Sequence, residues 1–330
     1  MIRTFVYSFV VAGACFAGQP PESPTPDNRI VWREPRPMTD SDWVWGPGGE
    51  QRAPVAPFQF VKENLGGTNP KVNVRDARGA LWIVKFGGEV HTDVFAARLL
   101  YATGYAAEPT YFIAQGEIRG VQGLKRAKAY IGKDGRFRNA RFKLRDDKKQ
   151  SYADQYKWTW VDNPFLGTHE MNGLRILAML ASNWDTKDAR DGEGSNTAVL
   201  LQRNSNSKVY WYALTDWGST LGSWGGFFKR SRWDSTAYQS QTRDFVKGVD
   251  KGTVVWGFQG KHGHDVADGI TVEDVRWILP YLSRITRDQM MAGLIASGAA
   301  PDTARKFSTA MRSRIEQLER IAAAPGGPTD

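Results

Sequence analysis

The stretch LWIVKFGGEVHTDVFAARLLYATGY, residues 81–105, decides the fold class of this chain. Its first part, Leu81–Phe86, is a run of apolar and β-branched side chains typical of a strand, with Lys85 next to its end. Apolar residues then recur at helical spacing over Thr92–Tyr101, and Gly104 stands where a helix would stop. The stretch therefore predicts a strand that carries a lysine, followed directly by a helix.

Strand patterns lie on both sides of this unit. Residues 58–63 and 71–75 alternate apolar and polar side chains, and the turn sequence NLGGTNP at residues 64–70 separates them. Downstream, residues 111–114 and the basic segment that follows continue the strand pattern. The first half of the folded chain is therefore expected to be rich in strands and to contain one helix.

After Pro164 the pattern changes to helices. Helical spacing extends over residues 171–183 and, after two predicted strands, over three later segments. The strands are 197–201 and 209–214, and the later helices are 272–282, 287–297 and 300–321. We expect an α+β protein with two lobes: an antiparallel sheet with one helix at 58–150, and a mainly helical lobe at 151–321.

The composition excludes several classes of protein. The chain has 330 residues, of which 41% are hydrophobic and 24% charged, a balance typical of globular proteins and not of coiled coils or disordered chains. Cys15 is the only cysteine, which excludes an intramolecular disulfide and a cysteine-based zinc site. The nucleophile motif Gly-x-Ser-x-Gly of α/β-hydrolases does not occur.

Both ends of the chain differ from this folded body. Residues 1–17 combine an early arginine, a short apolar run and small residues, which predicts a secretory signal peptide and therefore an exported protein. Cleavage after Ala14 would leave Cys15 as a lipid-bearing N-terminus, giving a periplasmic or cell-envelope lipoprotein attached to the membrane; a plain cleavage site nearby is the alternative. Residues 18–57 are predicted to be a Pro-rich tether, and residues 322–330 a disordered tail.

Positive charge is concentrated in residues 119–149. This segment holds twelve Lys and Arg against three Asp, a net charge of +9 that equals the formal charge of the whole chain. Such a segment favours an anionic partner, and a solvated basic hairpin is the alternative. The aromatic pattern of an RNA-binding sheet is missing, so nucleic acid is not the expected partner.

Four short features follow one another along the chain in an informative order. They are the Gly-Gly turn at residues 64–70, Lys85 on its strand before acids at the start of a helix, the run Asn183-Trp-Asp185-Thr-Lys187 with Asn196 opening a strand, and Asp216-Trp-Gly218 after a strand. Each feature alone is more simply a turn, an edge charge or an acidic surface loop. One fold that explains all four is the better interpretation.

In this order the features resemble the protein-kinase-like superfamily, specifically its atypical branches: HipA-type toxin kinases, phosphoinositide kinases and secreted casein-kinase-like enzymes. The chain also looks similar to uncharacterised exported bacterial proteins through VKFG at 84–87, RLLYATGY at 98–105 and DWGSTLG at 216–222. The resemblance covers about residues 58–221. It implies a two-lobed kinase-like fold and a phosphotransferase that uses ATP and Mg²⁺ or Mn²⁺.

The resemblance also implies which residues bind the nucleotide. Backbone N–H groups of Gly66, Gly67 and Thr68 would turn toward its phosphates. Lys85 would reach the α- and β-phosphates, oriented by Asp93 as first choice or by Glu89.

Four further residues complete the implied site. Asp185 would accept the proton of the acceptor hydroxyl, and Lys187 would neutralise the transferring phosphoryl group. Asn196 and Asp216 offer the oxygen ligands that Mg²⁺ or Mn²⁺ prefers.

The sequence departs from ordinary protein kinases within the catalytic loop. Asp185 and Asn196 are eleven positions apart, against about five in the kinase catalytic motif. We expect the intervening residues to loop out or Asp191 to take over a role; an EF-hand is excluded because Lys187 and Ala189 stand where oxygen ligands are required. His262 and His264 lack evident metal-binding partners.

Two hypotheses about function therefore remain. The first is an exported or lipid-anchored kinase-like phosphotransferase with an unknown acceptor. The second is a catalytically inactive kinase-like binding module of the cell envelope, which uses residues 119–149 to bind an anionic partner.

Overall fold

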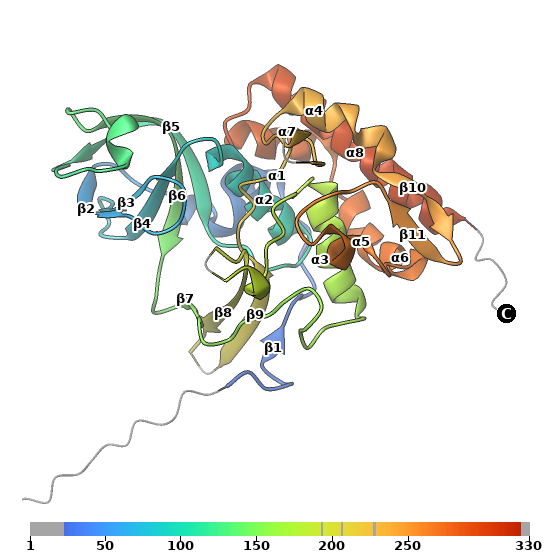
Figure 1. Cartoon of the computed structure of the whole chain (residues 1–330). Helices are drawn as coiled ribbons and strands as arrows, with labels where there is room; N and C mark the ends of the chain where they lie inside the picture. The colour runs from blue at the N-terminus through green and yellow to red at the C-terminus, as the bar shows by residue number, and fades with distance from the viewer. Residues whose placement is uncertain (1–22, 193, 206, 227–228, 325–330) are drawn as a thin grey trace, which may run out of the picture.

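The computed structural model describes residues 23–192, 194–205, 207–226 and 229–324, so the predicted signal peptide and Cys15 lie outside the described residues. The described chain forms two lobes (Figure 1). Strands dominate the N-terminal lobe, and helices dominate the C-terminal lobe, with a small sheet between them. This is the α+β fold with two lobes that the sequence predicts.

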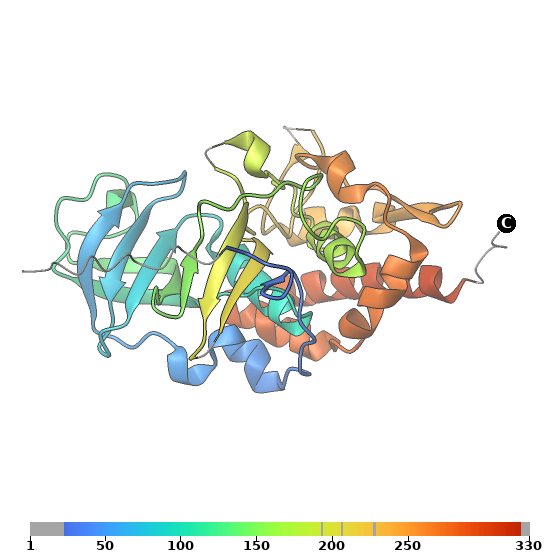
Figure 2. The same cartoon turned by 90° about the horizontal axis from the view of Figure 1, so that it is seen from below.

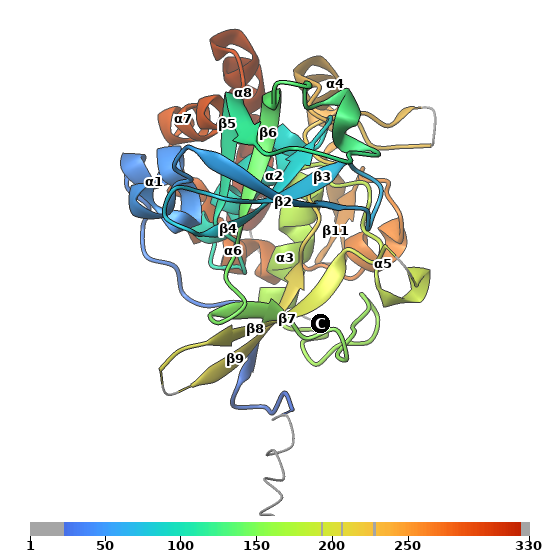
Figure 3. The same cartoon turned by 90° about the vertical axis from the view of Figure 1, so that its left-hand side faces the viewer.

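The strands of the N-terminal lobe, predicted as an antiparallel sheet, close into a barrel with the order β2-β3-β4-β6-β5 (Figure 3). They are β2 (Phe58–Asn64), β3 (Lys71–Arg75), β4 (Leu81–Phe86), β5 (Thr110–Arg119) and β6 (Arg136–Arg145). A short parallel pairing between β2 and β5 closes the ring. Because side chains alternate along a strand, the wholly buried Trp82 and Val84 fill the barrel and Lys85 points out of it.

Helix α2 (Val90–Ala102) lies between the barrel and the C-terminal lobe (Figures 1 and 3). Most of its residues are buried, including the charged Asp93 and Arg98. A helix that is buried on nearly every side must satisfy such charges with internal partners. These partners define the candidate site described below.

The C-terminal lobe packs helices around α3 (His169–Leu180), beside a four-stranded sheet of order β1-β9-β8-β7. The strands of this sheet are β1 (Arg29–Ile30), β7 (Gln150–Tyr152), β8 (Thr197–Arg203) and β9 (Lys208–Leu214). The helices after α3 are α4 (Ser235–Ser240), α5 (Gly263–Ala267), α6 (Val272–Ser283), α7 (Arg287–Ala296) and α8 (Pro301–Ala323). A separate hairpin is formed by β10 (Val246–Asp250) and β11 (Thr253–Trp256). No helix in the described part of the chain is long and apolar enough to cross a membrane.

The segment predicted as a tether differs most from expectation. Residues 29–57 contain β1, the helix α1 (Asp40–Trp45) and two 3-10 turns, η1 (Gly46–Gly48) and η2 (Glu50–Arg52). Trp43 is only 1% exposed and belongs to the main hydrophobic core. Helix α1 is six residues long, too short to produce a helical period in the sequence, and the prolines around it suggested a linker. At the other end, α8 continues to Ala323, two residues into the predicted tail.

Candidate active site

Lys85 lies at the centre of a buried group of charges between the barrel and α2. Its Nζ is 2.6 Å from Glu89 Oε2 and 3.1 Å from Asp93 Oδ2, so both acids suggested by the sequence contact it. Glu89 is the N-cap residue of α2 and Asp93 belongs to its first turn, which places both carboxylates at the positive end of the helix. Burial lowers the pKa of Lys85, but the charges of Asp93, Asp216 and Glu89 together more than offset burial, so the pKa is raised and Lys85 stays protonated.

Asp93 joins the barrel, α2 and the Asp216-Trp-Gly218 turn. Its Oδ2 also accepts a hydrogen bond from Arg141 Nη1 of β6 at 3.0 Å, and its Oδ1 accepts from the backbone N–H of Trp217 at 3.3 Å. Burial raises the pKa of Asp93, but Lys85 and Arg141 outweigh burial and hold it below its ordinary value. Asp93 is therefore a fixed anion that ties three elements together.

Asp216 is the carboxylate of this group that lacks comparable partners. Among the described residues, the one hydrogen bond found at its carboxylate is from Gly218 N–H to Oδ1, at 2.9 Å. Burial and the nearby charges of Asp93 and Glu89 raise its pKa, although Lys85 opposes them. The side chain is nevertheless partly exposed. A cation bound here would relieve this repulsion.

Gly218 is required by the close approach of Glu89. A Cβ at position 218 would lie 2.5 Å from Cδ and Oε2 of Glu89. The carbonyl of Gly218 also accepts a hydrogen bond from Thr92 Oγ1 at 3.1 Å. The glycine of the tripeptide thus lets the turn pack directly on the first turn of α2.

Two buried polar atoms on the outer face of the barrel have no hydrogen-bond partner among the described residues. They are Arg141 Nε and Asn73 Oδ1. Asn73 pairs with Ile83 in the register of β3 and β4, two positions along from the pairing of Lys71 with Lys85 and so on the same face of the sheet. A buried donor or acceptor without a partner costs about 1–3 kcal/mol. Both atoms therefore have unused capacity for a polar ligand.

The predicted catalytic loop lies between α3 and β8. Asn183 Oδ1 accepts a hydrogen bond from the backbone N–H of Asp185 at 3.3 Å, and Asn183 Nδ2 donates to the Asp216 carbonyl at 3.2 Å. Lys187 Nζ is 3.4 Å from Asp185 Oδ2. Asn196 Nδ2 donates to the Asp185 carbonyl. The structure therefore brings Asp185, Lys187, Asn196 and the Asp216 turn together, and Asn183, which had no assigned role, connects them.

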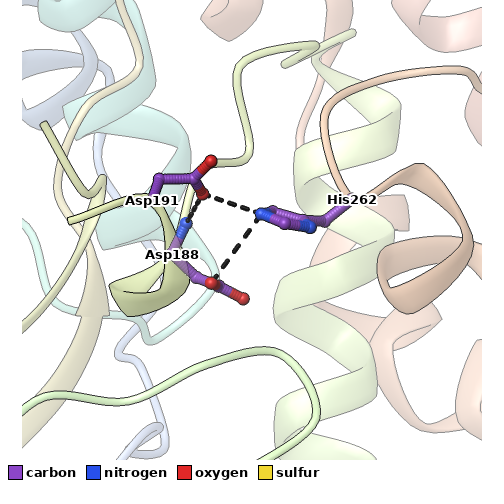
Figure 4. Close-up of side chains that lie close together, drawn as sticks. All are labelled: Asp188, Asp191 and His262. Carbon is purple, nitrogen blue, oxygen red and sulfur yellow. Dashed lines mark hydrogen bonds and ion pairs between the residues drawn. The ribbon is translucent and has the colours of Figure 1, made fainter.

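The residues between Asp185 and Asn196 loop out, as one of the two sequence expectations has it. Asp188, Asp191 and His262 gather there, with one ligand atom from each within 4.8 Å of the others (Figure 4). His262 Nε2 is 2.7 Å from Asp191 Oδ2. The sequence did not suggest this group, because His262 is distant in the chain.

Protein cations already neutralise this group. Asp188 is fully buried and accepts hydrogen bonds from Arg190 and from the backbone N–H of Trp160 at 3.0 Å. Lys261 Nζ is 3.1 Å from Asp191 Oδ1. Burial opposes ionisation, but hydrogen bonds from His262, the Asp188 N–H and Lys261 together lower the pKa of Asp191 to about 2. These ion pairs fix the loop, and they neutralise the carboxylates without a metal.

The glycine turn sits between β2 and β3, as predicted, but one of its N–H groups is already used. The Gly66 N–H donates to Asn64 Oδ1 at 3.1 Å, which corrects the expectation that it is free for a phosphate. Arg126 donates to the carbonyls of Leu65, Gly67 and Thr68. Arg126 therefore holds the turn by donating to the carbonyls of the turn. The backbone N–H groups that remain as candidates to bind a phosphate are those of Gly67 and Thr68.

A cavity lies between the lobes and shares Lys143 and Leu200 with a smaller pocket that reaches Asp93 and Arg141. Ile83 of β4 and Leu200 of β8 contribute apolar walls to the larger cavity, and residues 145–147 and 149–152, which connect the lobes, line another side. Lys143 at this cavity is 2.7 Å from Glu108 Oε2 and 3.1 Å from the hydroxyl of Tyr152. The cavity is therefore partly apolar and partly charged.

Sequence reasoning missed Arg141, Asn69 and Arg232, all of which contact the acids of α2. Asn69 Nδ2 donates to Glu89 Oε2 at 2.6 Å, and Arg232 forms an ion pair with Glu89 Oε1. Arg141 was counted only as part of the basic segment. Its pairing opposite Lys85 in β4 and β6 depends on strand register, which the sequence pattern does not fix.

Comparisons with known proteins are sparse. No protein-family model matches the chain, and no curated protein matches it. Among solved structures, the chain is similar to a crystal structure of the Golgi casein kinase with Mn and ADP bound: TM-score 0.41, 10% identity, covering 83% of this chain and 74% of that one. A second structure of the Golgi casein kinase gives a TM-score of 0.36 with 11% identity, over 82% of this chain and 76% of that one. Likeness this distant transfers no residue roles.

Proposed function

We propose that the protein is a kinase-like phosphotransferase that binds a nucleoside triphosphate, with ATP as first choice, together with Mg²⁺ or Mn²⁺. The observation that carries the proposal is the imbalance at Asp216. Its carboxylate accepts one hydrogen bond among the described residues, from the Gly218 N–H, and lies near two fixed anions, Asp93 and Glu89. Burial and these two charges raise the pKa of Asp216.

The residues present fit a nucleotide and a divalent cation. Arg141 Nε, buried and without a partner in the described residues, offers a donor next to Lys85 for an anionic group. Carboxylate and amide oxygens of Asp216 and Asn196 are ligands of the kind that Mg²⁺ and Mn²⁺ accept. A bound cation would supply charge neutralisation for phosphate oxygens. The adjacent cavity with Ile83 and Leu200 as apolar walls would take the nucleoside.

The chain's own residues would then do the following. Lys85, held by Asp93 and Glu89, binds phosphate oxygens, and the N–H groups of Gly67 and Thr68 cover them. Asp185 accepts the proton of the acceptor hydroxyl while the oxygen of that hydroxyl forms a bond to the γ-phosphorus. The bond from that phosphorus to the bridging oxygen breaks, and the nucleoside diphosphate leaves with the electron pair. Lys187, close to Asp185, stabilises the charge on the moving phosphoryl group.

Two substitutions separate binding from transfer. Asp216→Ala is expected to abolish cation-dependent nucleotide binding, because the phosphates and cation lose their main anchoring charge. Asp185→Asn is expected to leave the affinity for MnADP within about threefold of wild type and to lower phosphoryl transfer by about 10²–10⁴-fold. Titration calorimetry with MnADP and autophosphorylation with labelled ATP measure the two effects.

Undiminished labelling in Asp216→Ala would overturn the assignment and direct attention to Asp188 and Asp191. Nucleotide binding without any labelling, in wild type and Asp185→Asn alike, would favour the inactive binding module instead.

A second role, binding of an anionic partner, rests on the outer surface of the barrel. Of the basic residues in 119–149, eight are exposed: Arg119, Lys125, Lys128, Lys133, Arg136, Arg138, Lys148 and Lys149. Arg141, by contrast, is buried in the candidate site. We expect binding to heparin to weaken steeply with added salt and to weaken further in an Arg136→Glu, Arg138→Glu variant. Binding that ignores ionic strength would contradict this role.

We also propose export, with attachment to the cell envelope through a lipid on Cys15. The proposal rests on residues 1–17 of the sequence alone. Metabolic labelling with a fatty acid is expected to mark wild type and not Cys15→Ser. An unlabelled, exported wild-type protein would favour the plain signal peptide.

A further inference from the structure

Residues 29–57, here called the brace, connect the two lobes past α2 (Figure 2). The brace begins in the C-terminal lobe, where Arg29 and Ile30 pair with Tyr210 and Trp211 of β9. It ends on the N-terminal lobe, where the Val55 carbonyl accepts a hydrogen bond from the Ala77 N–H at 2.8 Å. In Figure 2 its blue helical part runs along one side of the molecule, from the barrel toward the C-terminal helices. Helix α2 is thus held by a segment anchored on both lobes.

Two points of contact fix the C-terminal end of α2. Trp32 Nε1 donates to the Thr103 carbonyl at 2.8 Å, and the Arg33 N–H donates to the Gly104 carbonyl at 2.9 Å. The last carbonyls of a helix lack partners within the helix, so donors from elsewhere are needed when the end is buried. The brace supplies them.

Arg98 makes the central contact between α2 and the brace. Its Nε donates to the Trp43 carbonyl at 2.8 Å and its Nη2 to the Val44 carbonyl at 2.6 Å, both at the C-terminal end of α1. The residue is 1% exposed, and no ion pair with a carboxylate is found for it in the described part of the chain. An arginine buried against backbone carbonyls alone is costly to desolvate, so its five donors depend on this geometry.

The packing around this contact leaves little freedom. A Cβ on Gly293 of α7 would lie 2.9 Å from Trp43 Cε3 and 3.3 Å from Arg98 Cδ. Gly46 has a φ of 71° and also lies close to Arg98: a Cβ on Gly46 would be 3.3 Å from Arg98 Nη1. The brace, α2 and α7 therefore meet without room for even one additional methyl group.

We propose that Arg98 is a positioning residue, which uses the brace to hold α2 where Asp93 and Glu89 reach Lys85 and Asp93 reaches the Trp217 N–H. Arg98 is five positions from Asp93 on the same helix, so a shift of α2 at Arg98 moves both acids. The link to activity rests on the proposed function. The link from Arg98 to Lys85 does not, because it concerns contacts within the chain.

The test compares Arg98→Met with Leu318→Ala in the full chain. Leu318 is as deeply buried but belongs to α8, which packs on α6 and α7. Lys85 reactivity toward an amine acylating reagent, measured by peptide mass spectrometry without nucleotide, is expected to rise at least fivefold in Arg98→Met and to stay within twofold in Leu318→Ala. Amide hydrogen exchange of residues 90–102 is expected to follow the same pattern: faster in Arg98→Met and nearly unchanged in Leu318→Ala. For both measurements, Arg98→Lys is expected to lie between wild type and Arg98→Met.

Affinity for MnADP is then expected to fall at least tenfold in Arg98→Met only. If Arg98→Met does not fold, Trp43→Phe takes its place, because it loosens the packing of the brace against Arg98. A folded variant whose Lys85 labelling and α2 exchange match those of Leu318→Ala would overturn the proposal. If wild type binds no nucleotide at all, the proposed function fails while the labelling result still decides the role of Arg98.

Discussion

Two groups of buried or partly buried charges lie close to the loop at residues 183–196, and they differ in how completely they are neutralised. Around Asp188 and Asp191, protein cations and N–H groups satisfy both carboxylates, and the pKa of each is lowered. Around Lys85, the carboxylate of Asp216 keeps a raised pKa and Arg141 Nε has no partner in the described residues. The group around Asp188 and Asp191 resembles a metal site in its geometry, but its carboxylates already have cationic partners; we call it the closed group. The group around Lys85 and Asp216 keeps a carboxylate without a matching cation and a hydrogen-bond donor without an acceptor; we call it the open group.

The difference shows why proximity of ligand-type residues is a poor guide to function. Carboxylates and a histidine within bonding distance of one another arise whenever a loop must be fixed by internal ion pairs. A site that binds a charged ligand must leave some charge or hydrogen-bonding capacity unused until the ligand arrives. By this criterion we propose the group at Lys85 and Asp216 as the ligand site, and not the group at His262.

The largest expected contrast is in the free energy of unfolding, when one carboxylate in each group is replaced by a neutral amide. Asp188→Asn is expected to lower the free energy of unfolding by about 2–3 kcal/mol, because charge-assisted hydrogen bonds to Arg190 and to the Trp160 N–H are weakened. Asp216→Asn is expected to leave it unchanged or higher, because it removes a carboxylate that lacks a matching cation. Urea denaturation measures both. Equal losses in the two variants would contradict the distinction.

A smaller effect is expected from adding one methyl group at the open group. Gly218→Ala places a Cβ against the Glu89 carboxylate, so Glu89 must move away from Lys85. We expect about a tenfold weaker affinity for MnADP and a loss of stability of about 1–3 kcal/mol from overpacking. Gly248→Ala, where a Cβ meets no atom within 4 Å, is the matched control. Unchanged affinity in Gly218→Ala would show that the Glu89 contact is dispensable.

The smallest effect concerns the pH dependence of the closed group. The pKa of Asp191 is lowered from 3.8 to about 2, so its stabilising contribution is complete above the unfolded pKa and is lost as the pH falls through the folded one. The stability difference between wild type and Asp191→Asn should therefore shrink as the pH falls from about 4 toward 2. A difference that stays constant over this range would place the stabilising charge elsewhere.

The sequence predicted the parts of this protein that local patterns encode. The Lys85 strand, the α2 helix and the Asp216 turn each have a periodicity or turn residue that marks them, and the structure places them as expected. The brace could not be predicted in this way, because Trp43 gains its buried position from α2 and α7, both far along the chain. Arg141 depended in the same way on strand register, and Arg98 on a partner that looked like a linker.

The central claim is that the group around Lys85 and Asp216 is completed by a nucleotide with its divalent cation. A thermal-shift titration with ADP, with and without Mn²⁺, tests it most directly. We predict that the melting temperature of wild type rises with ADP concentration only when Mn²⁺ is present, as about 2.7 kcal/mol of stabilisation at a hundred times Kd requires. Asp188→Asn should show the same rise from a lower starting temperature, and Asp216→Asn none. No rise in wild type at millimolar MnADP, or an equal rise in Asp216→Asn, would contradict the claim.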